Sequence, residues 1–581
     1  MVLLFLYLWY KKRFMKFHSI FIILFSLTFI SSCDESSENN NITVIKGGKT
    51  YGGELKFMSS DKVQGLFPLA VIDKYSFSIT AQIFESLVKI NLSTLEVEPS
   101  LAESWEVNEN GDVYTFKIRS GVYFHEDECL GGTREMKPAD VKFSLDFACS
   151  ALPMNKVGNA LGHKIKGGRT FFQNSQNTMP QNGVSGIKIK GKNAIEITLN
   201  KPFVGFEKIL SQPNIVVFPK ESYEKYKTEL PNHPVGTGPF ILSEKSDDGI
   251  KLTRNNSYWR KDDFGNQLPY LNALSISYTS DKKSEMMAFR QKEIDLLLEI
   301  PVLEIENVLG TLLEAKQGKN VKHRVESSFS LSMEYIGFNH ESPVFKKKQV
   351  RQAFMLAINP AEIIDTKLGG AGYPPTNGFI PEMAVLNNRI RTPSFDPEKA
   401  RSLLAAAGYP SGKGFPNLNI YVNALKDSKI HRLMEGIVEH LNQELNISLN
   451  IKLCNYAQRE AAIKSGEAHI WRAGWIADYP DASSFLGILY GHGTTSNAFR
   501  LADPRFDENF DKASVEKSQK ARDALLVNCA QQVVDDAFLL PVFNDNMLIM
   551  VNARVRGVVA NPVEIIDFTE VFIKEPRKIS S

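Results

Sequence analysis

Three segments between residues 396 and 453 restrict this chain to folds in which helices pack on a sheet. The stretch DPEKARSLLAAAGYP begins with Asp396 and Pro397, which suit the cap and the first position of a helix, and it ends at Gly408 and Pro410. The stretch at 431–445 repeats apolar residues at helical spacing, and ISLNIKL, which follows it, alternates like a strand. A helix that leads directly into a strand predicts an α/β lobe.

Further strands are predicted nearer the N-terminus. YTFKIRSGVYF at 114–124 alternates apolar and polar residues around a Ser-Gly turn, and AIEITLN at 194–200 alternates in the same way. No repeat at solenoid or propeller spacing is present. With 581 residues, the chain has room for several domains or for one large protein with several lobes.

The first 33 residues have the pattern of an export signal. From Met15, a lysine is followed by a short apolar run and by ISSC, which resembles the lipobox of bacterial lipoproteins and makes Cys33 the predicted lipidation site. The apolar run is shorter than the roughly 20 residues that a membrane-spanning helix needs. DESSENNN then has the composition of a flexible tether. An ordinary cleaved signal with a chance cysteine is the alternative for Cys33. Met15 is the predicted true start, with an N-terminal membrane segment in residues 1–14 as the alternative.

Composition is ordinary for a soluble globular protein, and the charge argues against one class of partner. The formal net charge is +2 and no basic cluster lies outside the N-terminus, so the pattern is not that of a nucleic-acid binder. Four cysteines follow Cys33, and Cys129 and Cys149 are a candidate disulfide in an oxidising compartment, with isolated buried thiols as the alternative.

Motifs of catalysis and of metal binding are not found. The sequence has no G-x-S-x-G, no complete phosphate-binding loop, no H-E-x-x-H and no C-x-x-C, and its ten histidines form no pair at metal-ligand spacing on a helix face. We therefore expect neither an enzyme nor a bound metal or cofactor.

Six blocks, in this order, carry a resemblance to a known family. They are VEPSLAESWEVNENGDVYTFKIRSGVYFH at 97–125, PVGTGPFIL at 234–242, NNSYWRK at 255–261, VRQAFMLAINP at 350–360, the helix that starts at Asp396, and RAGWIADYPDASSFL at 472–486. Together they resemble family 5 of the extracytoplasmic solute-binding proteins, the oligopeptide- and dipeptide-binding lipoproteins of peptide ABC transporters. The resemblance covers the chain from about Gly52 onward.

The resemblance implies two α/β lobes that close around a ligand by bending at a hinge, with an extra α+β domain inserted in the first lobe. It also implies a monomer, anchored by lipid at the outer side of a bacterial membrane, that passes its ligand to permease subunits. The expected limits are a signal at 1–33, a tether at 34–46, lobe I at 47–87, 212–329 and 541–581, the inserted domain at 88–211, and lobe II at 330–540.

The resemblance also implies a ligand site. In peptide-binding members the aspartate of the Ala-Asp-Tyr element holds the N-terminal ammonium of the peptide, and here that element contains Asp478 and Tyr479. A desolvated ammonium needs such a counter-charge. Trp475 would line side-chain pockets, Arg472 would meet a carboxylate or a neighbouring charge, and His431 would approach the C-terminal end of the ligand. A turn cap, a core ring, a structural ion pair and a structural histidine are the respective alternatives for Asp478, Trp475, Arg472 and His431.

Departures from the family pattern leave the ligand open. Phe67 stands where an aspartate is usual, Ala482 follows Asp481 where a proline is usual, and 129–136 looks like an insertion. A receptor for another solute, such as a nickel chelate, haem or an oligosaccharide, is therefore an alternative to a peptide receptor, and an exported peptidase is a third hypothesis.

Overall fold

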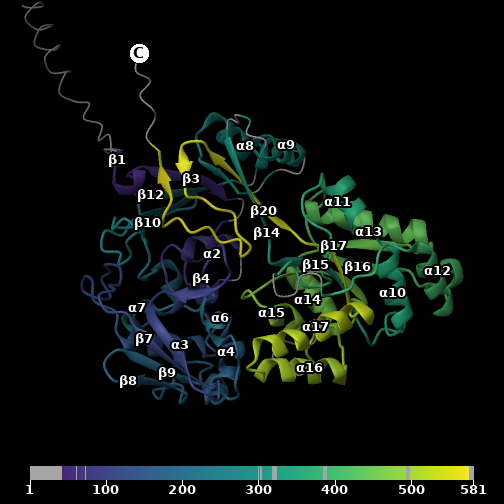
Figure 1. Cartoon of the computed structure of the whole chain (residues 1–581), viewed down its shortest axis with the longest axis horizontal. Coiled ribbons are helices and arrows are strands. Elements are labelled where there is room, and N and C mark those ends of the chain that lie inside the picture. The colour runs from purple at the N-terminus through teal and green to yellow at the C-terminus, as the bar shows by residue number, and fades with distance from the viewer. Residues whose placement is uncertain are drawn as a thin grey trace, which may run out of the picture.

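Two lobes and an inserted domain make up the molecule, which we describe from a computed structural model (Figure 1). The structure describes residues 42–574 apart from 60–61, 64, 72–73, 280, 299, 301–303, 317–318, 320–322, 384–388 and 492–497. The predicted signal, Cys33 and most of the predicted tether lie outside these residues. No helix in the described part is long and apolar enough to cross a membrane.

Lobe I is built on a seven-stranded sheet in which β3 lies parallel to β12 and β13, while the other neighbours are antiparallel. Helices α8 (Lys282–Gln291) and α9 (Ile305–Lys316) carry buried Met286, Phe289 and Val308 onto one face. The strands in spatial order are β10 (Phe240–Lys245), β11 (Gly249–Arg254), β12 (Ala273–Tyr278), β3 (Glu54–Ser59), β13 (Leu296–Leu297), β20 (Asn546–Asn552) and β14 (His323–Phe329). Short strands β1 (Thr43–Val44) with β2 (Thr50–Tyr51), and β21 (Val555–Arg556) with β22 (Phe572–Ile573), form separate pairs.

The inserted domain contains a four-stranded antiparallel sheet whose buried side chains join those of lobe I in one continuous core. Its strands in spatial order are β6 (Ala102–Val107), β7 (Val113–Ile118), β9 (Ala194–Thr198) and β8 (Ile187–Lys190), next to the hairpin of β4 (Val88–Ile90) and β5 (Val97–Pro99). The helices of lobe I and of this domain that surround the shared core are α2 (Lys74–Thr80), α3 (Pro138–Ala148), α4 (Gly158–Lys164), α5 (Gly168–Asn174), α6 (Phe206–Leu210) and α7 (Lys220–Tyr226).

Lobe II is a five-stranded sheet with helices on both faces, as the helix–strand succession predicts. Its strands in spatial order are β17 (Leu449–Cys454), β16 (Leu418–Asn423), β18 (Ile470–Ile476), β15 (Ser332–Phe338) and β19 (Leu539–Phe543). One face is covered by α10 (Lys348–Ala357), α11 (Pro360–Leu368), α12 (Pro397–Ala406) and α13 (Lys429–Leu445). The other is covered by α14 (Tyr456–Ser465), α15 (Ala482–Leu486), α16 (Pro504–Val515) and α17 (Gln519–Asp535).

The chain passes between the lobes at two adjacent places. One crossover runs from β14 to β15 and the other from β19 to β20, and the amide of Ser330 donates to the carbonyl of Asp545 at 3.0 Å between them. The Asn544 side chain adds a bond to the carbonyl of Ser330 at 2.9 Å. Strand β19 continues to Phe543 in the lobe II sheet, beyond the predicted lobe limit at residue 540. The other domain limits stay predictions.

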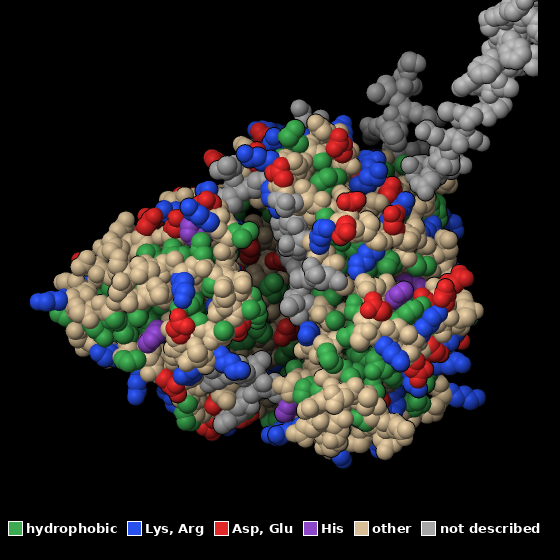
Figure 2. Space-filling view, turned by 180° about the vertical axis from the view of Figure 1, so that it is seen from behind, with side chains coloured by type: hydrophobic (Ala, Val, Ile, Leu, Met, Phe, Trp, Pro, Cys, Tyr) green, Lys and Arg blue, Asp and Glu red, His purple; other side chains and the backbone are tan. Residues whose placement is uncertain are grey.

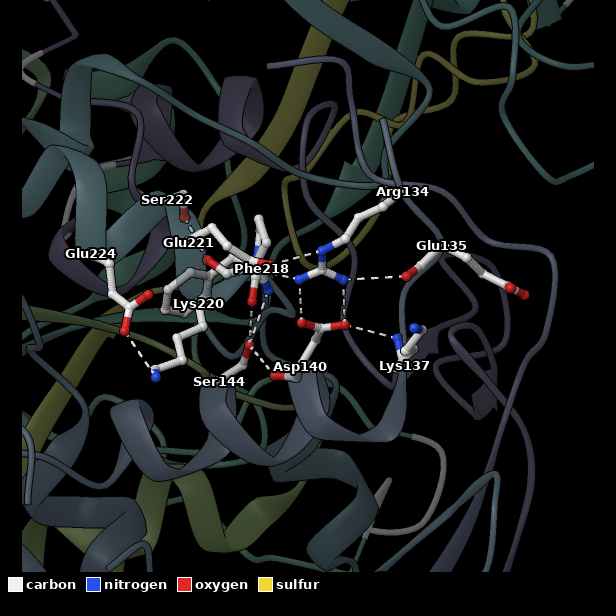
Figure 3. Close-up of polar contacts among 11 residues, drawn as sticks. Arg134, Glu135, Lys137, Asp140, Ser144, Phe218, Lys220, Glu221, Ser222 and Glu224 are labelled. Atoms are coloured by element: carbon white, nitrogen blue, oxygen red, sulfur yellow. Dashed lines mark hydrogen bonds and ion pairs between the residues drawn. The ribbon is translucent and has the colours of Figure 1, made fainter. Parts of the chain in front are cut away.

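An ion-pair network between the inserted domain and lobe I ties two helix starts together (Figure 3). The Arg134 guanidinium donates to both oxygens of Asp140, on α3, at 2.7 and 2.9 Å, and to both oxygens of Glu221, on α7, at 2.6 and 3.0 Å. Asp140 is nearly fully buried and also accepts a bond from the amide of Lys137 at 2.8 Å. Removing the arginine would leave that buried carboxylate without its cation.

We expect Arg134→Met to lower the free energy of unfolding by about 2–4 kcal/mol, because a buried charge loses its partner. Urea unfolding followed by circular dichroism measures the change. The matched control is Lys220→Met at the exposed Lys220–Glu224 pair nearby, where about 0.5 kcal/mol or less is expected. Equal effects of the two substitutions would contradict this account of Arg134.

Candidate functional site

The predicted site lies on lobe II, at the end of β18 and in the loop that leads to α15. Residues 477–481 form this loop and are called the 477–481 loop below. Its first amide, that of Ala477, donates to the carbonyl of Leu331 at 2.8 Å, and Leu331 belongs to the first crossover between the lobes. The loop therefore starts at the hinge. Figure 2 shows the hollow between the two halves of the molecule, with acidic side chains visible inside it.

Asp478 is an exposed residue. Its backbone amide donates to the Ser484 hydroxyl at 2.9 Å, but its carboxylate has no hydrogen bond or ion pair with any other described residue. Although the side chain is open to solvent, the protein around it reduces hydration and raises the pKa of Asp478 from 3.8 to about 6. A partly desolvated carboxylate without a partner favours binding of a cation.

Asp481, three residues later, is in the opposite situation. Its carboxylate is buried and accepts bonds from Arg522, on α17, at 2.8 and 2.9 Å and from Lys208, on α6, at 3.1 Å. It also caps α15 by accepting from the amide of Ser483 at 2.9 Å. Burial alone would raise the pKa of Asp481, but Arg522 and then Lys208 outweigh it and hold the pKa well below its usual value. Asp481 is therefore fully engaged within the protein.

Tyr479 lies between the two aspartates and points toward the other half of the molecule. Its ring packs against the shared core of lobe I and the inserted domain, and its hydroxyl lies 3.2 Å from that of Ser483. The packing of Tyr479 on that core and the Asp481–Lys208 pair together make the 477–481 loop part of the boundary between the lobes.

Arg472 and Trp475 extend to opposite faces of β18. The Arg472 side chain lies on the same face of the sheet as Glu334 and forms an ion pair with it at 2.5 Å. Arg472 also donates a hydrogen bond to the Asn423 side chain at 3.2 Å. Burial raises the pKa of Glu334, and the guanidinium of Arg472 opposes that effect. Arg472 thus has the structural ion pair that the sequence left open.

Trp475 packs against the core on the α14–α17 side of the sheet, next to Met333 on β15. Its indole N–H is buried and has no hydrogen-bond partner among the described residues. Because Trp475 and Arg472 face opposite ways, the structure does not bring both beside Asp478. A ligand contact for either side chain stays a prediction.

His431 lies in the first turn of α13, which follows β16 at the end where Asn423 is found. Its Nδ1 accepts a bond from the amide of Asp427 at 3.2 Å, and its own amide donates to the Ser428 hydroxyl at 3.3 Å. The imidazole is nearly fully buried. These bonds give His431 a local role at the helix start, and its predicted contact with a ligand is untested.

Other candidate chemistry is sparse in the described residues. Cys129 and Cys149 are both free thiols, so the disulfide that the sequence allowed is not formed. No group of three potential metal ligands is found among the residues that the structure describes. Two cavities of about 590 and 210 Å³ lie in lobe II, and none of the five predicted ligand residues lines either one.

Comparison with known proteins identifies the family. Residues 96–497 match the bacterial extracellular solute-binding proteins, family 5 Middle. This chain belongs to that family. Among relatives of this family 5 protein, Heme-binding protein A of Haemophilus influenzae is 29% identical over 544 residues, which cover 92% of this chain and 95% of the relative.

Two further proteins show how far the similarity extends along this family 5 chain. Di/tripeptide-binding protein 1 of Pseudomonas aeruginosa is 24% identical over 539 residues, covering 90% of this chain and 95% of the relative. The structure of the periplasmic binding protein DppA from Helicobacter pylori in complex with the peptide STSA superposes with a TM-score of 0.74 at 24% identity. The superposition covers 90% of this chain and 99% of the DppA chain. The two-lobed fold with an inserted domain is therefore confirmed.

The raised pKa of Asp478 predicts a cost in stability for this family 5 protein. A carboxyl whose pKa is higher in the folded state destabilises the fold as pH rises through the interval from 3.8 to about 6. We expect Asp478→Asn to raise stability at pH 7.5 by up to about 1 kcal/mol, a value reduced because the group is exposed, and to have little effect at pH 4.

Thermal unfolding at the two pH values measures this difference. The control is Asp247→Asn, at a carboxylate that is 99% exposed, where little change is expected at either pH. A gain at pH 4 as large as that at pH 7.5 would contradict the pKa assigned to Asp478.

Proposed function

We propose that this family 5 protein is a receptor that captures peptides between its two lobes and delivers them to the permease of an ABC transporter. The observation that carries the proposal is the carboxylate of Asp478, which has no partner among the described residues and lies in a loop that starts at the hinge and reaches the boundary between the lobes. A peptide ammonium would supply the cation that this carboxylate lacks, through a charge-assisted hydrogen bond.

Relatives support a peptide as the solute. Di/tripeptide-binding protein 1 carries peptide binding in its name, and the Helicobacter pylori structure contains the peptide STSA. Affinity for peptides of varied sequence would come from their backbone and termini, with roughly 0.5–1.5 kcal/mol for each net hydrogen bond. A handful of such bonds and one clamped ammonium add up to about −8 kcal/mol, which corresponds to a dissociation constant of about 1 μM.

The cellular setting belongs to the same proposal. The signal-like segment and Cys33 support export followed by lipid anchoring, so that a monomeric receptor stays at the outer side of the membrane, close to its permease. Binding and release without catalysis fit a family of solute-binding proteins.

Haem is the second candidate solute, because the relative from Haemophilus influenzae is named a haem-binding protein. Haem carries two carboxylates and no ammonium, so it would not supply the ammonium that we propose as the partner of Asp478. The state of Asp478 therefore favours a peptide.

Mass spectrometry of the ligands that co-purify with the protein, and of a peptide mixture incubated with it, separates the possibilities. We expect intact peptides with free N-termini. A Soret absorbance band of the purified protein, which indicates haem, would overturn the proposal. Another solute or cleavage products in the mass spectra would do the same, each in favour of a different function.

We expect Asp478→Asn to weaken binding of a captured peptide by about 10- to 100-fold, the value of one charge-assisted hydrogen bond. Titration calorimetry with the same peptide and with its N-acetylated form measures the effect. The acetylated peptide has no ammonium, so its affinity should be nearly the same for both proteins. Equal losses for the two ligands would exclude the ammonium role of Asp478.

Acid should weaken binding as well, because the ammonium pairs with the ionised form of Asp478. With a pKa of about 6, the ionised fraction falls roughly tenfold between pH 7.5 and pH 5. We expect the affinity for the free peptide to fall by about that factor in calorimetry, and the Asn variant to lose this dependence. A pH profile shared by both proteins would assign the effect to another group.

A further inference from the structure

The two lobes are held together by contacts that the residues following Asp478 make. Tyr479 packs against the core of lobe I and the inserted domain, and Asp481 accepts a bond from Lys208 at 3.1 Å. A third contact is made nearby, where Lys517 of lobe II donates to the carbonyl of Glu109 in the inserted domain at 2.6 Å. The carboxylate that we assign to the ligand therefore lies in a loop that is fixed from across the boundary.

The partners of Asp481 come from different halves of the molecule. Arg522 belongs to α17 of lobe II, the lobe that also contains Asp481, and its two bonds do not depend on how the lobes are arranged. Lys208 belongs to α6, which follows the four-stranded sheet of the inserted domain. Separation of the lobes would break the bond to Lys208 and keep those to Arg522.

Because Arg522 and Lys208 belong to different halves of the molecule, the Lys208 contact can break and form again. A buried carboxylate that lost every cation would strongly resist opening, because an unpaired charge in the interior is costly. Arg522 keeps Asp481 compensated, and the Lys208 side chain, 27% exposed, can hydrate when it is released. At this ion pair, opening then costs a modest amount, added to the loss of the Tyr479 packing and of the Lys517 bond.

We propose that Lys208 is a positioning residue that stabilises the closed arrangement of the lobes by pairing with Asp481, and so holds Asp478 at the ligand. The inference rests on the proposed function in one respect: a ligand has to be captured between the lobes. Because Lys208 acts on closure, its contribution is the same for every ligand that requires closure, whatever its terminal groups.

The test is Lys208→Met, which removes the ammonium and keeps the bulk of the side chain. We expect about three- to tenfold weaker binding of the free and of the N-acetylated peptide alike, with faster dissociation in surface plasmon resonance. Small-angle X-ray scattering of the protein without added ligand should show a larger radius of gyration. Lys208→Arg should restore both properties.

Lys142→Met is the matched control. Lys142 is also 27% exposed and pairs with Asp146, which is 9% exposed, at 2.7 Å, but both residues lie on α3, so the pair does not change when the lobes move. We expect this variant to keep the wild-type affinity and radius of gyration. Circular dichroism confirms that all variants are folded.

Several results would overturn the inference about Lys208. Unchanged affinity and scattering for Lys208→Met would show that the pair does not contribute to closure. A loss confined to the free peptide would assign Lys208 to the ammonium site, and equal losses in Lys142→Met would assign the effect to general stability. If the wild-type protein bound no peptide, the proposed function would fail, while the scattering comparison would still decide the role of Lys208.

Discussion

The double crossover between the lobes is the constraint on which the rest of the structure depends. Phe329 ends the last strand of one sheet and Ser332 begins the other, and the chain returns between Phe543 and Asn546 directly beside it. The hydrogen bonds of Ser330 and Asn544 join the two passages, so they act as one hinge. Each lobe keeps its own sheet and core on either side of this hinge, which permits the lobes to move as rigid units.

Two aspartates in one loop near this hinge are in opposite electrostatic states, and the proposed site rests on that difference. Asp481 is neutralised by Arg522 and Lys208, and its pKa is low; Asp478 has no cation among the described residues, and its pKa is raised. The first anchors the loop and the second stays available. A carboxylate kept unpaired beside a fixed one is pre-organised for a ligand cation, because little side-chain or loop ordering remains to be done on binding.

Local chemistry explains what the sequence could predict. Asp396 caps α12 through the amide of Lys399, as its position before Pro397 indicates, and the apolar spacing of 431–445 gives α13. The alternation in β18 also carried a signal that was missed: Trp471, Ala473 and Trp475 are odd-numbered and Arg472 is not, so the two faces could have been separated. The pairing of Asp481 with Lys208, 273 residues away, depends on how the lobes meet and has no local signal.

The same loop links selectivity to closure by different means. In the proposed function, Asp478 distinguishes ligands by charge, since an ammonium completes it and a carboxylate does not. Lys208 and Tyr479 act on the distance between the lobes, which every captured ligand shares. Because the two proposed roles belong to different residues, a change in ligand preference at position 478 need not alter how the lobes close, and relatives with different solutes could keep one mechanism of closure while the charge at the site varies.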